Sequence, residues 1–128
     1  IRGQENFRLG GWQGYQGQDF EAVVDLGESR TIRRLAAGFC QHTDSWILMP
    51  RFVEFWASDD GQTFQHAGTV KNHVPDNDLN PIQLDLELKL RTKARFIKVK
   101  AENYGPLPQW HAGAGQPAYI FIDEIMIE

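Results

Sequence analysis

Hydrophobic and polar residues alternate with a period of two along most of the chain. The clearest run has an apolar residue at every second position from Ile82 to Leu90, with Gln, Asp, Glu and Lys between them. Successive side chains of a strand point to opposite faces, so this pattern predicts a half-buried β-strand. The same alternation predicts further strands, whose apolar positions lie within residues 20–26, 35–39, 53–57 and 97–101.

The final segment, residues 119–127, is apolar at both parities, which is typical of a strand covered on both faces. Residues 27–29, Gly-Glu-Ser, predict a turn. Asp60-Gly61 predicts a tight hairpin, because glycine accepts the positive φ that such turns require. No long stretch has the apolar spacing of an amphipathic helix. The expected fold class is therefore all-β, with a spacing of strands that suits a sandwich.

Length and composition narrow this expectation to one folded domain. A chain of 128 residues, 41% of them hydrophobic, is long enough for one core and too short for two. We therefore expect residues 1–128 to form a single domain. The chain opens on Ile1-Arg2-Gly3 and not on a signal segment, so we expect a piece excised from a larger protein.

The net charge of −4 argues against nucleic acid and anionic lipid as partners. Both bind through clustered Lys and Arg. No run approaches the roughly 20 apolar residues of a membrane-spanning helix, so we expect no transmembrane segment.

Three predicted loops, residues 10–17, 41–50 and 103–117, contain large aromatic residues that loops ordinarily lack. Recognition of a sugar needs an aromatic ring face and a few planar polar groups, and these loops supply both. The candidate ligand-binding residues are Trp12, Tyr15, Gln41, Asp44, Trp46, Asn103, Tyr104, Trp110 and His111. The alternative for each of them is that it packs against or caps its own loop.

Several strings resemble the discoidin, or coagulation factor 5/8 type C, superfamily. "DFEAVVDLG" at 19–27, "SDDGQTF" at 58–64 and "ARFIKV" at 94–99 occur in that family's order, and "IFIDEIMIE" is similar to its final strand. The bacterial branch of the superfamily includes the family 32 carbohydrate-binding modules. Longer stretches, 6–27, 38–55 and 103–125, are similar to the domain that follows the catalytic part of many bacterial chitobiases and β-hexosaminidases.

This resemblance implies a jelly-roll β-sandwich of about eight main antiparallel strands, with a ligand surface made by loops at one end. It also implies a structural calcium ion, for which Asp123 and Glu124 match acidic positions near the family's final strand. The family's upstream Asp-Gly is missing, and Glu5 and Asn6 are the nearest oxygen donors. Calcium takes six to eight oxygens, which these residues alone do not supply.

The function implied is that of a non-catalytic module on a secreted glycoside hydrolase of the chitobiase or β-N-acetylhexosaminidase type. Its partners would be a glycan, weakly bound as a hexose or N-acetylhexosamine, and the catalytic domain of the same polypeptide. The parent protein would be secreted, periplasmic or on the cell surface. The chain itself offers no good pair of carboxyls for acid–base hydrolysis. Asp59 and Asp60 lie in a predicted hairpin, and Asp123 and Glu124 are neighbours on a predicted strand, where successive side chains point to opposite faces.

Two alternatives remain open from the sequence. In the first, the aromatic loops pack on the adjoining catalytic domain and bind no soluble ligand. In the second, the apolar run Trp46-Ile47-Leu48-Met49 forms an exposed spike that adheres to lipid or protein. Exposure of these side chains in the folded domain separates the alternatives.

Overall fold

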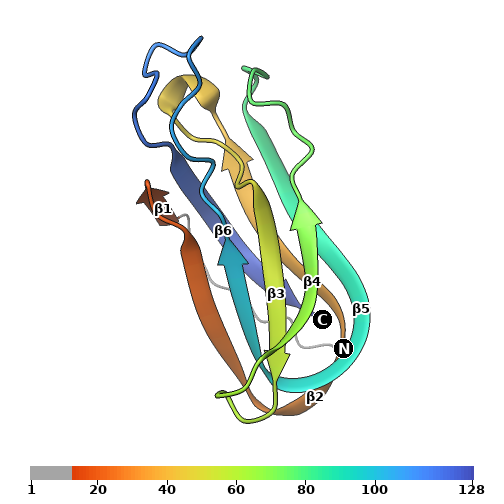
Figure 1. The fold of residues 1–128 in the computed structure, drawn as a ribbon. Coiled ribbons are helices and arrows are strands. Elements are labelled where there is room, and N and C mark those ends of the chain that lie inside the picture. The colour runs from red at the N-terminus through yellow and green to blue at the C-terminus, as the bar shows by residue number, and fades with distance from the viewer. Residues whose placement is uncertain (1–12) are drawn as a thin grey trace.

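The computed structural model describes the backbone of residues 13–128 and the side chains of residues 16–128 other than Asp123. Its strands are β1 (Gln13–Gln16), β2 (Phe20–Gln41), β3 (Phe52–Ser58), β4 (Gln65–Lys71), β5 (Ile82–Ala101) and β6 (Tyr119–Ile127), and η1 (Thr43–Ser45) is a short 3₁₀ turn. Neighbouring strands pair antiparallel in the order β1-β6-β2-β5-β3-β4 (Figure 1). The predicted all-β class is confirmed.

Two unusually long strands fold this sheet into a sandwich. β2 has 22 residues and β5 has 20, and they pair along almost their whole length. Both ribbons curve round the lower end of the molecule in Figure 1. One layer contains β1, β6 and the paired segments 30–41 and 82–94, and the other contains β3, β4 and the paired segments 20–25 and 96–101.

The number of continuous strands is six among the described residues, where about eight were expected. The difference arises at the bend, because the predicted turn at 27–29 lies inside β2 as a shift of register between Asp25 and Arg30. Gly27 adopts φ 86° there, and its N–H donates to the Asp25 carboxylate at 2.8 Å. Such a bulge sharpens a bend without ending the strand.

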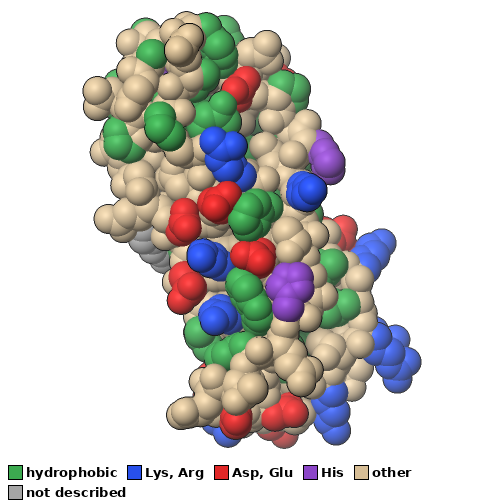
Figure 2. All heavy atoms as spheres, viewed as in Figure 1, with side chains coloured by type: hydrophobic (Ala, Val, Ile, Leu, Met, Phe, Trp, Pro, Cys, Tyr) green, Lys and Arg blue, Asp and Glu red, His purple; other side chains and the backbone are tan. Residues whose placement is uncertain are grey.

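The hairpin between β3 and β4 is confirmed, although its connection is longer than a two-residue turn, running from residue 59 to 64. The Asp60 carboxylate organises it by accepting the backbone N–H groups of Gln62 and Thr63 at 2.8 and 2.9 Å. β4 is the second arm of this predicted hairpin, although the sequence pattern assigns no residues to it. Its side chains are exposed or half-buried in no alternating order, which is typical of an edge strand. Acidic, basic and hydrophobic side chains are interspersed over the face of the molecule that Figure 2 shows.

The core lies between the two layers. Its largest fully buried apolar side chains come from β2, β3, β5, β6 and the loop before β3, and they are Phe39, Phe55, Ile32, Leu35, Leu48, Met49, Ile97, Ile120, Ile122, Ile125 and Ile127. Gly68 on β4 marks a close approach to the other layer, because a Cβ there would lie 2.7 Å from Cδ2 of Leu88 on β5. A side chain at this position would have to displace the leucine.

We therefore expect Gly68→Ala to lower the free energy of unfolding by about 1 kcal/mol or more, through overpacking. Leu88→Val in the same chain should recover part of that loss, because it shortens the clashing side chain. Chemical denaturation measures both, with Lys71→Ala on the exposed face of β4 as the control. Equal stabilities of Gly68→Ala and the parent would contradict this packing.

Candidate functional site

Three loops meet at one end of the sandwich, at the top of Figure 1, and together form what we call the loop end. They comprise residues 42–51 between β2 and β3, 72–81 between β4 and β5, and 102–118 between β5 and β6. The first and third overlap segments that the sequence analysis selected for their aromatic residues. The second carries no such signal, because its polar composition with two prolines, Pro75 and Pro81, is that of any surface loop.

Hydrogen bonds join these loops into one unit. The Thr43 hydroxyl donates to the carbonyl of Asp76 at 3.1 Å, so the first loop is tied to the second. The Thr43 carbonyl in turn accepts the imidazole Nε2–H of His111 at 2.6 Å, which ties it to the third. The backbone N–H of Tyr119 donates to the carbonyl of Trp46 at 2.8 Å. The loop end is therefore cross-linked by polar contacts between segments distant in sequence.

Gln41 is one of the buried polar groups that fasten the loops. Its side chain is 1% exposed. Its amide Nε2 donates to the Pro75 carbonyl at 2.9 Å, and its Oε1 accepts the backbone N–H of Met49 at 3.2 Å. Both polar ends of this candidate ligand residue are thus engaged by the protein backbone.

Asn103 has the same character and joins three segments, its own loop, residues 18–19 and Ala118. It is 7% exposed, and its Nδ2 donates to the carbonyls of Ala118 at 3.0 Å and Gln18 at 3.3 Å. Its Oδ1 accepts the N–H of Gly105 at 2.8 Å, and its own N–H donates to Asp19 at 2.9 Å. The side chain therefore holds the base of the third loop against the starts of β2 and β6.

His111 is also buried, at 8% exposed, and both ring nitrogens are engaged. Nε2 faces a carbonyl, which can only accept, while Nδ1 accepts the N–H of Gly113 at 2.8 Å. This pair of contacts fits the neutral tautomer with the proton on Nε2. Gly113 is tightly packed, since a Cβ there would lie 2.7 Å from Cε2 of Trp46.

Trp46 and Tyr104 are half-buried and pack against a small apolar cluster of Leu48, Leu107 and Ala118. The Tyr104 hydroxyl donates to the Asp76 carboxylate, and the Arg51 guanidinium lies 5.0 Å above the tyrosine ring. Burial, together with the bond to Asp76, raises the pKa of Tyr104 to about 12. Tyr104 thus links the second loop to the third and supports a cation on its ring.

Trp110 and Asp44 are the predicted candidates that face solvent. Trp110 is 52% exposed, and its indole lies beside the anchored ring of His111 with the centroids 5.8 Å apart. Asp44 is exposed in η1. Trp12 lies outside the described residues. Tyr15 lies in β1 opposite Ile120, and its side chain is not described.

A cavity of about 450 Å³ opens at the base of the third loop, and we call it the base cavity. Its lining residues share small or planar side chains and are Gly17, Asp19, Arg51, Glu102, Asn103, Gly105, Pro106, Gly115 and Pro117. Only Asn103 among these was a candidate from the sequence. Strand pairing brings the charged residues Asp19, Arg51 and Glu102 together. Each lies just beyond the end of its strand, and these ends are adjacent because Phe20 of β2 and Val53 of β3 both pair with Ala101 of β5.

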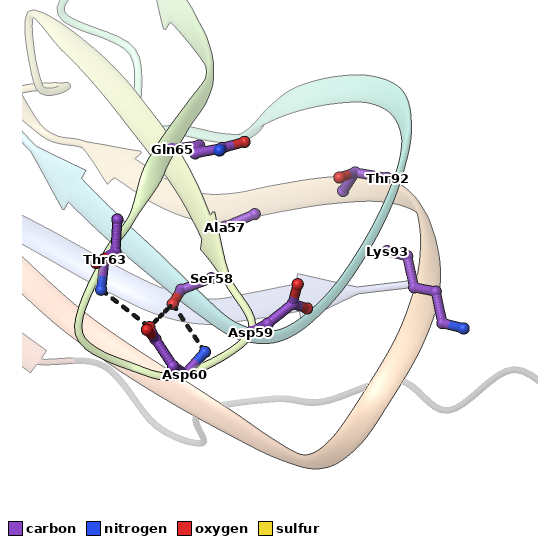
Figure 3. Close-up of a pocket in the computed structure, with 8 residues that line it drawn as sticks. All are labelled: Ala57, Ser58, Asp59, Asp60, Thr63, Gln65, Thr92 and Lys93. Atoms are coloured by element: carbon purple, nitrogen blue, oxygen red, sulfur yellow. Dashed lines mark hydrogen bonds between the residues drawn. The ribbon is translucent and has the colours of Figure 1, made fainter.

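A second cleft, the hairpin cleft, lies next to the β3–β4 connection, which Figure 1 places at the lower end of the molecule (Figures 1 and 3). It measures about 270 Å³ and contains the neighbouring carboxyls of Asp59 and Asp60. The Asp60 carboxylate also accepts the Ser58 hydroxyl at 2.9 Å. Hydrogen bonds, first from the N–H of Thr63, lower the pKa of Asp60. Asp60 therefore serves the turn as an ionised acceptor, which does not suit a general acid.

The structure bears on three further expectations. Leu48 and Met49 are buried and Trp46 and Ile47 are half-buried, which disfavours the alternative in which this apolar run forms an exposed adhesive spike. The described residues contain no helix long and apolar enough to cross a membrane. Those residues also contain no group of three or more His, Cys, Asp or Glu that could hold a metal. Glu124 lies on β6 and the Asp123 side chain is not described, so the calcium ion stays a prediction.

Comparison with known proteins identifies the fold. A carbohydrate-binding module of family 32, from AlyQ in complex with 4,5-unsaturated mannuronic acid, matches with a TM-score of 0.55 and 13% identity over 91% of this chain and 76% of that one. A glycoside hydrolase matches with a TM-score of 0.51 and 20% identity over 83% of this chain, which spans only 18% of the hydrolase. The predicted resemblance to family 32 modules is confirmed at the level of the fold, and with it the jelly-roll sandwich.

The C-terminal domain of a chitobiase from Bacteroides fragilis is also among the similar structures. It has a TM-score of 0.41 and 20% identity over 87% of this chain and 66% of that domain. No protein-family model and no curated protein matches the sequence.

The buried hydrogen bonds of the Asn103 side chain lead to a prediction about the free energy of unfolding. Asn103→Asp would place a carboxylate oxygen against the carbonyls of Gln18 and Ala118, so we expect unfolding to become easier by about 2 kcal/mol or more. Asn77→Asp, which makes the same chemical change at an exposed position, should alter stability by no more than about 0.5 kcal/mol. Chemical denaturation of both variants tests this, and equal losses would contradict it.

Tyr104 gives a pH prediction. Its pKa in the folded state, about 12, lies above the ordinary value of 10.0, so the folded protein holds this proton more tightly than the unfolded chain. The contribution of this raised pKa to the free energy of unfolding is fully present below about pH 10 and is lost as the pH rises toward 12. Phenolate absorbance should show one of the three tyrosines titrating late, and Tyr104→Phe should remove that phase. Common titration of all three near pH 10 would contradict the assignment.

Proposed function

We propose that this chain is a non-catalytic carbohydrate-binding module that holds a glycan at its loop end. The observation that carries the proposal is the contrast in burial among the loop residues. Gln41, Asn103 and His111 are buried and fix the loops, while Trp110 on the same framework is 52% exposed. An aromatic ring held at the surface by a rigid base is what stacking against a sugar requires.

The chemistry of the loop end supports this proposal. Trp110 offers a ring face to the C–H groups of a pyranose. The exposed carboxylate of Asp44 follows Thr43, whose carbonyl anchors the neighbouring His111, and it can accept hydroxyl protons. A module with the same fold is known in complex with 4,5-unsaturated mannuronic acid, which is itself a sugar derivative. The ligand that we propose is a hexose or N-acetylhexosamine.

The proposed affinity is weak, near a millimolar, which corresponds to about −4 kcal/mol, because a shallow site gains little after ordering costs. Weak binding is useful when the module is tethered, since it raises the local concentration of glycan for a linked domain. We therefore propose that a glycoside hydrolase in the same polypeptide performs the chemistry. The parent protein would work where glycans are, as a secreted, periplasmic or cell-surface protein.

Isothermal titration with galactose, N-acetylgalactosamine, N-acetylglucosamine and chito-oligosaccharides tests the proposal. At least one sugar should bind saturably, and Trp110→Ala should weaken it by about tenfold through loss of stacking. Val23→Ala is the matched control, because Val23 is an equally exposed apolar residue on the sheet, and it should leave binding unchanged.

Two outcomes would oppose the proposal. Absence of heat with every sugar at high concentration would favour a structural module that packs on a neighbouring domain. Binding that survives Trp110→Ala unchanged would keep the glycan but remove Trp110 as its platform.

A further inference from the structure

The base cavity combines a carbohydrate-sized space with an unusual charge. Its volume of about 450 Å³ lies within the range of small-molecule sites. Among the described residues that line it, Asp19 and Glu102 are acidic and Arg51 is basic, so its formal charge is −1. This negative charge favours a cationic ligand over a neutral or anionic ligand of the same size.

Arg51 is held in place by its neighbours. Its guanidinium stacks 5.0 Å from the centroid of the Tyr104 ring, and Tyr104 is itself fixed by its bond to Asp76. A Cβ at Gly105 would lie 3.4 Å from the Nη2 atom of Arg51. No ion pair joins Arg51 to an acid among the described residues, so its N–H groups remain available to donate to hydroxyls.

The two carboxylates differ in how far they are engaged. Asp19 is exposed, and one of its oxygens accepts the backbone N–H of Asn103 at 2.9 Å, which orients the carboxylate and leaves the second oxygen for a ligand. Glu102 is half-buried, and no side-chain hydrogen bond to it is found within the described part of the chain. Together they offer acceptors to a group that carries several protons.

The walls suit a sugar ring better than a chain of methylenes. Gly105 and Gly115 have φ of +103° and +83°, a conformation that side chains disfavour, so this backbone stays bare toward a ligand. Pro106 and Pro117 pair across the loop and present rigid C–H surfaces. A compact ring with polar groups at its rim can contact these surfaces and reach the charged side chains.

We infer that the base cavity binds an amino sugar with a free ammonium group, and that it disfavours uronic acids. Asp19 and Glu102 accept hydrogen bonds from the ammonium group, and Arg51 donates to ring hydroxyls. N-acetylation removes the positive charge and with it the preference. The inference rests on the proposed function and deepens it, because it adds to the proposed hexose or N-acetylhexosamine a deacetylated amino sugar that this part of the loop end prefers.

Titration with glucosamine, N-acetylglucosamine and glucuronic acid at about pH 6, where the sugar amine is protonated, tests this inference. We expect glucosamine to bind roughly three- to tenfold more tightly than N-acetylglucosamine, and glucuronic acid to bind most weakly. In Asp19→Asn/Glu102→Gln the preference for glucosamine should disappear, because the shapes are kept and the charge becomes +1. Added salt should weaken the preference in the parent protein.

The control variant Asp59→Asn/Asp85→Asn removes two exposed charges elsewhere and should keep the preference. Sugar binding with no preference for glucosamine, or a preference that survives Asp19→Asn/Glu102→Gln, would overturn the inference and leave the proposed function intact. An equal response to ethanolamine would assign a general cation site and also overturn it. No binding of any sugar would instead count against the proposed function itself.

Discussion

The buried carboxamide of Asn103 is the contact on which the loop end depends. It donates to the segments that lead into β2 and β6 and accepts from the third loop at Gly105, so it binds both sides of the base cavity. A buried amide without partners would cost more free energy than a typical hydrogen bond returns, which makes this arrangement nearly all-or-none. His111 likewise fixes the third loop by donating to the Thr43 carbonyl of the first loop. Gln41 fixes the second loop by donating to the Pro75 carbonyl.

The fold could be predicted from the sequence further than the site could. Strict alternation from Ile82 to Leu90 identified a strand, and the apolar residues of 119–127 identified β6. The continuous path of β2 through Gly27 was missed, because a bulge and a turn use the same residue types. The bounds of β4, the second arm of the predicted hairpin, could not be assigned because an edge strand need not alternate.

The site residues were harder to predict for a different physical reason. Gln41, Asn103 and His111 have side chains that pair equally well with sugar hydroxyls and with backbone carbonyls, and only the tertiary fold decides which partner each meets. Asp19, Arg51 and Glu102 are far apart in the sequence and become neighbours through the antiparallel register of three strands. Trp110 is a candidate from the sequence as an aromatic in a glycine-rich loop, but its exposure is a property of the folded chain.

The loop end therefore uses different residues of the same chemical types for structure and for ligand contact. Buried polar groups hold the loops, and exposed groups on those loops are left to meet a ligand. The residues that line the base cavity include three bare glycines and two prolines, which contribute shape, while a few charged side chains contribute selectivity. Such a division lets the lining charges change with little loss of the framework, provided that residue 19 keeps an oxygen to accept the N–H of Asn103.

The most direct test of this account is a two-dimensional ¹H–¹⁵N spectrum of the protein recorded during titration with glucosamine. The account predicts saturable shifts confined to the base cavity and the rest of the loop end, at the amides of Asp19, Glu102, Gly105 and Gly115 and at the indole N–H of Trp110. The hairpin cleft around Asp59 and Asp60 should stay unchanged, because its carboxylate is engaged in the turn. Shifts centred on the hairpin cleft, or no shifts at saturating sugar, would contradict the account.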